Sequence, residues 1–213
     1  MLTDSIEKHI DQNLLKAIPK QNFYNYLLID SEKLYNLIDR LEAKNHNIDK
    51  IDVNDFKTTV IYIGKGSDNR KMFHLTEAKY HLDYDVITNK KSKQIIKVWR
   101  NGNGIVILQI YSDSNHYVAL CRENAMIRAA KPNITNIRNG SSYGIMKDQW
   151  SKTEISDYGD SLLYYAIKKC IIERPTPYFP VHVLSKKKKH KPTDFIKSKY
   201  EYNGILELFL ELN

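Results

Sequence analysis

Three short runs of aromatic and β-branched residues constrain the fold of this chain more than any other feature. They are FYNYLLI at residues 23–29, TTVIYIG at 58–64 and IVILQIY at 105–111. Runs of this length and composition are typical of β-strands, because branched and aromatic side chains pack well on a pleated surface. We therefore expect a three-stranded sheet. The third run is the most apolar, so we expect it to be the central strand.

Apolar residues at helical spacing mark the segments around these strands. Helices are expected at residues 1–20, 31–41, 68–80, 85–99, 115–130 and 154–172, a loop at 44–55, a turn at 101–104, an irregular segment at 174–180, and a strand or helix at 205–212. Strands and helices mixed in this way indicate an α+β fold. The 213 residues fit one generous domain. We expect an N-terminal helix (1–21), a central domain (22–150) and a helical, basic C-terminal extension (151–213) that packs on the same domain.

The charge balance favours polyanionic partners. Lys and Arg number 33 against 25 Asp and Glu, which gives a formal net charge of +8. Such a field attracts nucleic acid or an anionic membrane, but it carries no information about chemistry. The 42% hydrophobic content argues for a folded protein over most of the chain.

Cysteine usage and the lack of long apolar runs bear on location. Cys121 and Cys170 have no zinc-type spacing, so both are expected to be buried thiols. No apolar run reaches the length of a membrane span, and the first residues do not resemble a signal peptide. We expect an intracellular protein of the nucleus or cytoplasm, with no membrane contact and no obligate protein partner.

Several side chains have the chemistry of a phosphate-processing site. Arg70 and His74 lie four apart on an expected helix, so they project from one side, where a guanidinium and an imidazole suit a phosphate. Glu123 lies beside the apolar face of a later helix. A single carboxylate is enough for Mg²⁺ when water and a substrate phosphate complete the coordination.

These residues together resemble the GIY-YIG nuclease domain over about residues 22–144. Tyr24-Asn25-Tyr26 stands where the family has its first tripeptide, and Tyr62-Ile63-Gly64 matches the second. The further matches are Lys65, Arg70, His74, Glu123 and Asn136. Tyr24 and Asn25 replace the first glycine and isoleucine of the name, a departure that costs little because the phenol of Tyr26 is the functional part.

The order of the motifs is most similar to the branched-DNA nucleases of the ankyrin-repeat and LEM-domain group. The motifs are Y-x-Y-L-L-I-D, Y-I-G-K-G, R-x-x-x-H-L-x-E-A, R-E-N-A-M-I and S-Y-G. The chain shows no ankyrin or LEM segment. We therefore expect either an excerpted catalytic domain or a relative without those modules.

The resemblance implies a mainly antiparallel three-stranded sheet and a metal-dependent DNA endonuclease. Glu123 would hold one Mg²⁺ or Mn²⁺ ion against the scissile phosphate. Arg70 and Lys65 would stabilise the charge that grows on the phosphate. Tyr62 or Tyr26 would orient the attacking water and accept its proton.

Other residues complete this expected site. His74 would share a hydrogen bond with one of the tyrosines, and Asn136 would take part in catalysis. A phenol with a pKa near 10 is a poor base at neutral pH, so Lys65, Arg70 and the metal must favour the phenolate. The expected DNA contacts come from a glycine turn that exposes backbone N–H groups and from basic side chains: Gly64, Gly66, Lys71, Lys186, Lys187 and Lys188.

Each feature also has an ordinary structural interpretation. Tyrosines in strands are usually packing residues, and Glu123 could pair with Arg122 or Arg128. The lysine block at 186–189 is most often a solvated loop, with DNA contact or nuclear import as the minority interpretation. His81, His116 and His182 lack partners at metal spacing and are taken as surface or packing residues.

Two other functions stay open on the sequence. One is a restriction-type nuclease that cuts duplex DNA at a fixed sequence. The other is a basic nucleic-acid-binding module that keeps the fold without turnover.

Overall fold

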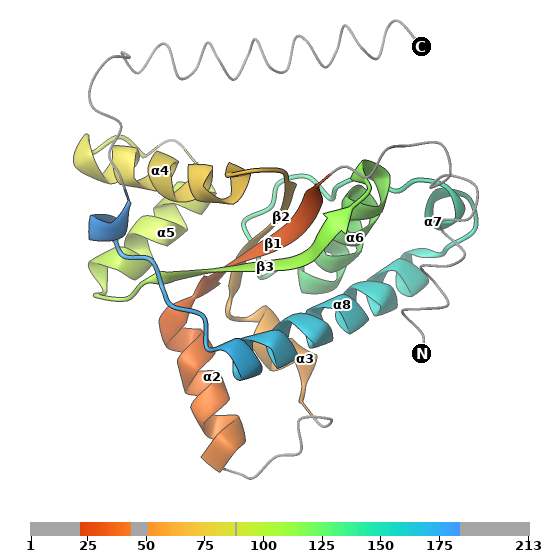
Figure 1. The fold of residues 1–213 in the computed structure, drawn as a ribbon, viewed down its shortest axis with the longest axis horizontal. Helices are drawn as coiled ribbons and strands as arrows, with labels where there is room; N and C mark the ends of the chain where they lie inside the picture. Colours follow the sequence, from red (N-terminus) through yellow and green to blue (C-terminus); the bar gives the residue numbers. More distant parts are fainter. Residues whose placement is uncertain (1–21, 44–50, 88, 184–213) are drawn as a thin grey trace, which may run out of the picture. The chain divides into compact units, whose positions relative to one another are not determined.

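A computed structural model describes residues 22–43, 51–87 and 89–183 of the chain (Figure 1). The predicted N-terminal helix, the lysines at 186–188 and the predicted element at 205–212 lie outside these residues. In chain order the elements are β1 (Phe23–Asp30), α2 (Ser31–Ala43), α3 (Val53–Lys57), β2 (Val60–Gly66), α4 (Arg70–Asp83), α5 (Lys90–Arg100), β3 (Ile105–Ser114), α6 (His116–Ala130), α7 (Ile145–Asp148), α8 (Lys152–Glu173) and the 3-10 helix η2 (Pro180–His182). The α+β class expected from the sequence is confirmed.

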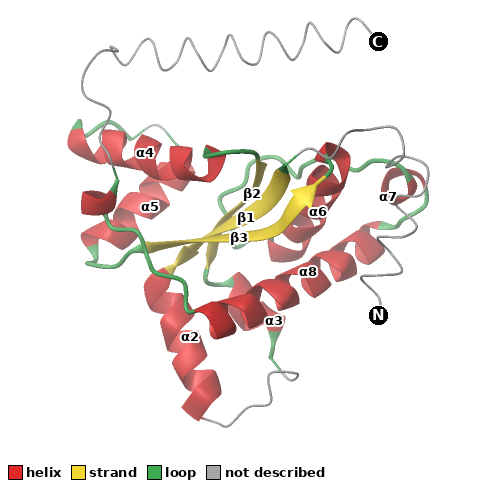
Figure 2. Ribbon diagram, in the orientation of Figure 1, coloured by secondary structure: helices red, strands yellow, loops and turns green. Residues whose placement is uncertain are grey.

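The three strands form one antiparallel sheet in the order β2-β1-β3 (Figure 2). β1 is therefore the central strand, and the prediction that gave this position to β3 is wrong. High apolar content does not separate a central strand from an edge strand whose two faces are both covered. The edge of β3 is closed at its start, where Ile105 and Tyr178 exchange backbone hydrogen bonds of 2.9 and 2.8 Å.

Alternate residues of β1 point to two different helical layers, as the two-residue period of a strand requires. Leu27 and Ile29 join the core formed with α2, α3, α6 and α8. Tyr24, Tyr26 and Leu28 join a second core formed with α4 and α5. The sheet thus lies between two layers of helices, and its α4–α5 side is lined by tyrosine.

Several element boundaries differ from the predictions. α3 occupies part of the predicted loop at 44–55, because the Asp52 side chain caps it by accepting from Asn54 N–H at 2.8 Å and Phe56 is fully buried. α5 begins at Lys90 rather than 85, since Asn89 caps it by accepting from Ser92 N–H at 2.8 Å. β2 continues to Gly66 and includes both glycines predicted to form a turn.

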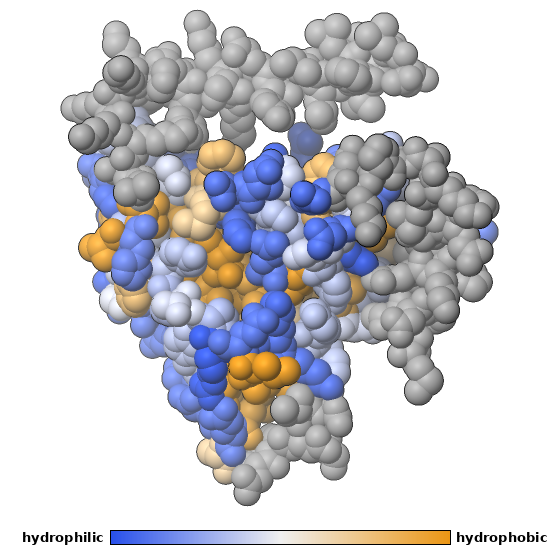
Figure 3. Space-filling model, viewed as in Figure 1, coloured by the Kyte–Doolittle hydropathy of each residue, from blue (hydrophilic) through white to orange (hydrophobic). Residues whose placement is uncertain are grey.

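The prediction that both cysteines are buried thiols is confirmed. Cys121 and Cys170 are both free and buried. On the face drawn in Figure 3, hydrophobic residues appear as separate patches among hydrophilic ones. None of the helices within the described ranges is both long and apolar enough to cross a membrane.

Candidate active site

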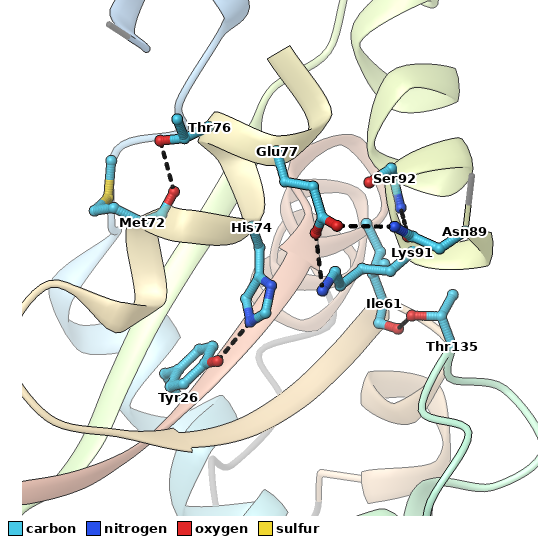
Figure 4. A network of polar contacts seen from close by, with 10 residues as sticks. All are labelled: Tyr26, Ile61, Met72, His74, Thr76, Glu77, Asn89, Lys91, Ser92 and Thr135. Atoms are coloured by element: carbon cyan, nitrogen blue, oxygen red, sulfur yellow. Dashed lines mark hydrogen bonds and ion pairs between the residues drawn. The ribbon is translucent and has the colours of Figure 1, made fainter. Parts of the chain in front are cut away.

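Tyr26 and His74 form the buried centre of the site. The Tyr26 hydroxyl and His74 Nε2 share a hydrogen bond of 2.6 Å, and Tyr26 is only 1% exposed (Figure 4). Burial raises the pKa of Tyr26, and burial together with the charges of Lys91 and Arg70 lowers the pKa of His74 to about 2. The pair is therefore a neutral phenol and a neutral imidazole at physiological pH.

Gly64 makes room for this pair from the neighbouring strand. Tyr26 is paired with Gly64 across β1 and β2, and a Cβ on Gly64 would lie 2.5 Å from the Tyr26 ring. Both Gly64 and Gly66 lie within β2, so the prediction that they form a turn is wrong. Gly64 is needed for the close approach of a side chain, and its predicted DNA contact stays a prediction.

Tyr62 lies next to the pair on the same side of the sheet. Its ring centroid is 4.7 Å from that of His74 and 6.2 Å from that of Tyr26. Burial raises the pKa of Tyr62 to about 12; the Glu123 carboxylate also raises it, whereas the Arg70 guanidinium lowers it. The basic side chains of the protein do not by themselves favour the phenolate, because burial outweighs them.

Glu123 and the segment at 135–136 attach to the outer edge of β2. Glu123 Oε1 accepts from Lys65 N–H at 3.0 Å. Asn136 Oδ1 accepts from Ile63 N–H at 3.0 Å, and its Nδ2 donates to Ile63 O at 2.7 Å. Thr135 donates to Ile61 O from both its N–H and its hydroxyl, each at 2.8 Å. Every second residue of β2 is therefore held from outside.

These contacts give Glu123 and Asn136 different surroundings. Both polar atoms of the Asn136 amide contact the backbone of Ile63, so Asn136 fixes the strand beside Tyr62. Its predicted part in catalysis stays a prediction. Glu123 uses one oxygen on Lys65, and within the described ranges no hydrogen bond or ion pair engages the other. That oxygen is available to a ligand.

The surroundings of Glu123 fit a single divalent ion. Burial raises the pKa of Glu123, while the Lys65 N–H and the charges of Lys65 and Arg70 lower it. A buried carboxylate with few neutralising partners gains from a bound cation. Among residues 22–43, 51–87 and 89–183, no group of three or more His, Cys, Asp or Glu could hold a metal. An ion here would keep most of its ligands as water or substrate oxygens, as Mg²⁺ commonly does.

Lys65 and His116 form a contact that sequence reasoning missed. Lys65 Nζ lies 2.8 Å from His116 Nδ1 and 4.4 Å from the centroid of the Phe23 ring. Burial lowers the pKa of Lys65 to about 8; Glu123 raises it and Arg70 lowers it. The prediction of His116 as a surface or packing residue overlooked this contact. The contact depends on the strand register. Phe23 pairs with Ser114, and this pairing brings the start of α6 beside Lys65.

Arg70 is the first residue of α4, and the loop before it is fixed by Tyr24. The Tyr24 hydroxyl donates to Asp68 O at 2.6 Å. The exposed Arg70 side chain acts on the pKa values of Tyr24, Tyr26, Tyr62, Lys65, His74 and Glu123. The charge of one guanidinium therefore acts on the ionisation of all six of these side chains. Lys71, predicted to contact DNA, donates to the Gln109 side chain and lies 5.4 Å from the Tyr24 ring centroid.

The structure thus gathers six of the predicted residues at one end of β2, namely Tyr26, Tyr62, Lys65, Arg70, His74 and Glu123. Together they offer neutral phenols, a neutral imidazole, two cationic side chains and one carboxylate with a free oxygen. This set can bind a phosphate, hold one metal ion and orient a water molecule.

Comparisons with known proteins bear on the family to which the chain belongs. A family model described as the LEM-3-like GIY-YIG domain matches residues 23–184. The Caenorhabditis elegans homolog of ankyrin repeat and LEM domain-containing protein 1 is 29% identical over 157 residues, covering 71% of this chain and 21% of that protein. The mouse protein of that name is 28% identical over 155 residues, covering 71% of this chain and 28% of its own length.

The human protein of the same name matches the chain over a segment of similar length. It is 26% identical over 158 residues, covering 71% of this chain and 25% of its own length. The chain therefore matches only about a fifth to just over a quarter of these relatives. No solved structure matches the chain.

Proposed function

This chain belongs to the family of LEM-3-like GIY-YIG domains, a nuclease type, and from that membership we propose that it is a divalent-metal-dependent endonuclease that hydrolyses phosphodiesters in branched DNA. One observation carries the proposal. The strand β2 that carries Tyr62 also binds the Glu123 carboxylate, which accepts from Lys65 N–H at 3.0 Å, and it ends beside Arg70, whose Cβ is 3.1 Å from the Cβ position of Gly66. A water-orienting phenol, a metal ligand and an anion-binding group are therefore gathered along one strand.

The residues of the chain divide the work of hydrolysis. Glu123 would hold the ion through the oxygen that Lys65 N–H leaves free. When bound, the ion supplies Lewis-acid activation of the phosphate and lowers the pKa of nearby water. Arg70 and Lys65 bind the phosphate and stabilise the negative charge that develops on it. The remaining task, orienting the attacking water and handling its proton, falls to the aromatic side chains.

Tyr62 orients the attacking water, with His74 beside it. Because the pKa of Tyr62 is raised to about 12, the phenol is protonated at neutral pH and becomes a base only when extra positive charge reaches it. His74 stays neutral because its pKa is lowered to about 2, so it does not take up the proton itself; its ring, 4.7 Å from that of Tyr62, packs beside the phenol and positions it. Tyr26 holds His74 in place through the 2.6 Å hydrogen bond.

The preference for branched DNA rests on the resemblance to the ankyrin-repeat and LEM-domain nucleases. The net charge of +8 favours contacts with phosphates, which carry no base-sequence information. The resemblance then implies that the DNA is recognised by its shape.

A cleavage assay tests the proposal. The chain is incubated with intact duplex, a splayed duplex and a four-way junction, each with Mg²⁺, Mn²⁺ or a chelator. We expect cleavage of the branched substrates only, and only with metal. Cutting of intact duplex at a fixed sequence would instead indicate a restriction-type enzyme, and DNA binding without any cleavage would indicate a non-catalytic module.

Glu123→Gln identifies the metal ligand in the same assay. The amide oxygen of glutamine still accepts from Lys65 N–H, so the fold is preserved while the charge is lost. We expect cleavage to disappear and DNA binding to remain. Glu173→Gln is the matched control, because Glu173 ends α8 and pairs only with Lys169, at 2.8 Å, among the described residues. Unchanged cleavage in Glu123→Gln would exclude Glu123 as the ligand.

A further inference from the structure

A groove lined by basic side chains runs along α5, outside the candidate active site. It has a volume of about 580 Å³. Its charged lining residues are Lys90, Lys93, Lys97 and Arg100, and no Asp or Glu of the described residues lines it. Ile87, Ile96 and Thr135 supply much of the remaining wall. The groove is therefore a shaped surface of one charge sign.

The four cations form a row on one side of α5. They stand at positions 90, 93, 97 and 100, and these spacings of three and four residues keep them on one helix face. The opposite face of α5 is buried through Ile95, Val98 and Trp99. At 1.5 Å per residue the row is about 15 Å long.

These cations are largely free of acidic neighbours. Within the part of the chain that the structure describes, no ion pair includes Lys90, Lys93 or Lys97. Arg100 lies 3.8 Å from Asp85, and both side chains are more than half exposed. A solvated helix face is often laced with ion pairs of both signs. This face has almost none, so its charge is available to an anion.

The row begins beside the candidate active site. Lys91, next to Lys90, lies with its Nζ 5.0 Å from the centroid of the Tyr62 ring. Lys91 is held there by Glu77 at 3.4 Å, as Figure 4 shows. On the other side of the groove, Thr135 is bound to Ile61, one residue before Tyr62. A strand whose phosphate reaches Tyr62 can therefore continue along α5.

We propose that this groove binds the phosphate backbone of a DNA strand that leads away from the cleaved position. A DNA strand is a line of regularly spaced negative charges, and the row presents positive charges along about 15 Å of helix. The match is one of sign and of linear arrangement. The identity of the ligand rests on the proposed function, since the strand is the arm of its DNA substrate.

The test is the salt dependence of DNA binding by Lys93→Gln/Lys97→Gln. Both lysines are exposed, so the double variant should fold. Binding to a splayed duplex is measured with chelator, where no cleavage occurs, between 50 and 200 mM salt. Each lost phosphate contact lowers the slope of log affinity against log salt by about one unit. We expect a slope lower by about two units, which makes the fall in affinity over this range roughly tenfold smaller.

The matched control is Lys147→Gln/Lys152→Gln. These lysines are also exposed and lie on α7 and at the start of α8, at the opposite end of the described fold from α5 (Figure 1). The net charge changes equally in both variants, so a general loss of charge would affect both slopes alike. We expect the control to keep the slope of the unchanged protein. Equal slopes in the two double variants would overturn the proposal.

Cleavage separates failure of this inference from failure of the proposed function. We expect the unchanged protein and the control Lys147→Gln/Lys152→Gln to cut branched DNA at the same rate, and this cleavage tests the proposed function without involving the groove. If the protein cleaves branched DNA but the salt slope of Lys93→Gln/Lys97→Gln is unchanged, the groove is excluded as a DNA site and the proposed nuclease function stands. A reduced slope in a protein that cuts no DNA would keep the groove as a DNA site and remove the nuclease.

Discussion

The two faces of β1 differ in the work they do, although their residues alternate along one strand. On one face Leu27 and Ile29 are fully buried among aliphatic side chains of the helices. On the other face Tyr24 and Tyr26 are just as inaccessible, with 5% and 1% exposure, but they make polar contacts with α4 and the loop before it. Burial alone therefore does not separate core from site.

The difference lies in what burial does to each face. On the aliphatic face it removes apolar area from water and stabilises the fold. On the tyrosine face it shifts ionisation, raising the pKa of Tyr62 to about 12 and lowering that of His74 to about 2. Substitutions on the first face should change stability, and substitutions on the second should change activity.

The largest effect is expected for Tyr62→Phe. Loss of the hydroxyl that orients water should slow single-turnover cleavage of branched DNA by about 10²–10⁴-fold, the usual contribution of acid–base groups. Tm and DNA affinity should stay close to those of the unchanged protein, because the ring and its contacts remain. Unchanged cleavage by Tyr62→Phe would show that the tyrosine face is not required for activity, and the two faces would then not differ in function.

Leu27→Ala tests the aliphatic face. Leu27 is fully buried, so its truncation should lower the free energy of unfolding by about 2–5 kcal/mol through lost transfer energy and a residual cavity. Urea denaturation measures this loss. The folded fraction should cleave at the normal rate, and slow cleavage by fully folded protein would show that the aliphatic face also shapes the chemistry.

Tyr26→Phe tests a residue expected to act on both properties. The variant leaves His74 Nε2 without its 2.6 Å partner in a buried place, which should cost about 1–3 kcal/mol of unfolding free energy. Cleavage should fall less than in Tyr62→Phe, because Tyr26 acts through His74. Equal losses of cleavage in the two tyrosine variants would give both phenols the same role.

The smallest effect concerns the pH profile and Lys65. Its pKa is lowered to about 8, so the ammonium is present below that pH and is lost above it. If the cation binds the phosphate, the ammonium contribution should fall about tenfold from pH 7 to pH 9. Lys65→Arg stays charged throughout, so its profile should lack this fall. Parallel profiles would show that Lys65 acts without its charge.

Most of the fold followed from local patterns in the sequence. Runs of aromatic and β-branched residues predicted the three strands, because such side chains pack well on a pleated surface. Strand order did not follow, because apolar runs do not distinguish β1 from β3. The short helix α3 depends on the Asp52 cap and on the burial of Phe56, a contact that forms only in the folded protein.

The site was predictable where a motif was local and was missed where contacts were distant. The resemblance to the GIY-YIG family, confirmed by the match over residues 23–184, located Tyr62, Arg70 and Glu123. It did not reveal that His116 contacts Lys65, a pair 51 residues apart in sequence. It also gave no indication of the contacts that Asn136 makes with Ile63.

The hydrogen bonds on the outer side of β2 have a consequence for solubility. An uncovered strand edge is a template on which another chain can add a strand. Glu123, Thr135 and Asn136 occupy this edge at Lys65, Ile61 and Ile63. These contacts therefore cover backbone groups that could otherwise pair with a strand of another copy. Asn136→Ala should consequently be recognised first by self-association, before any change in chemistry is measured.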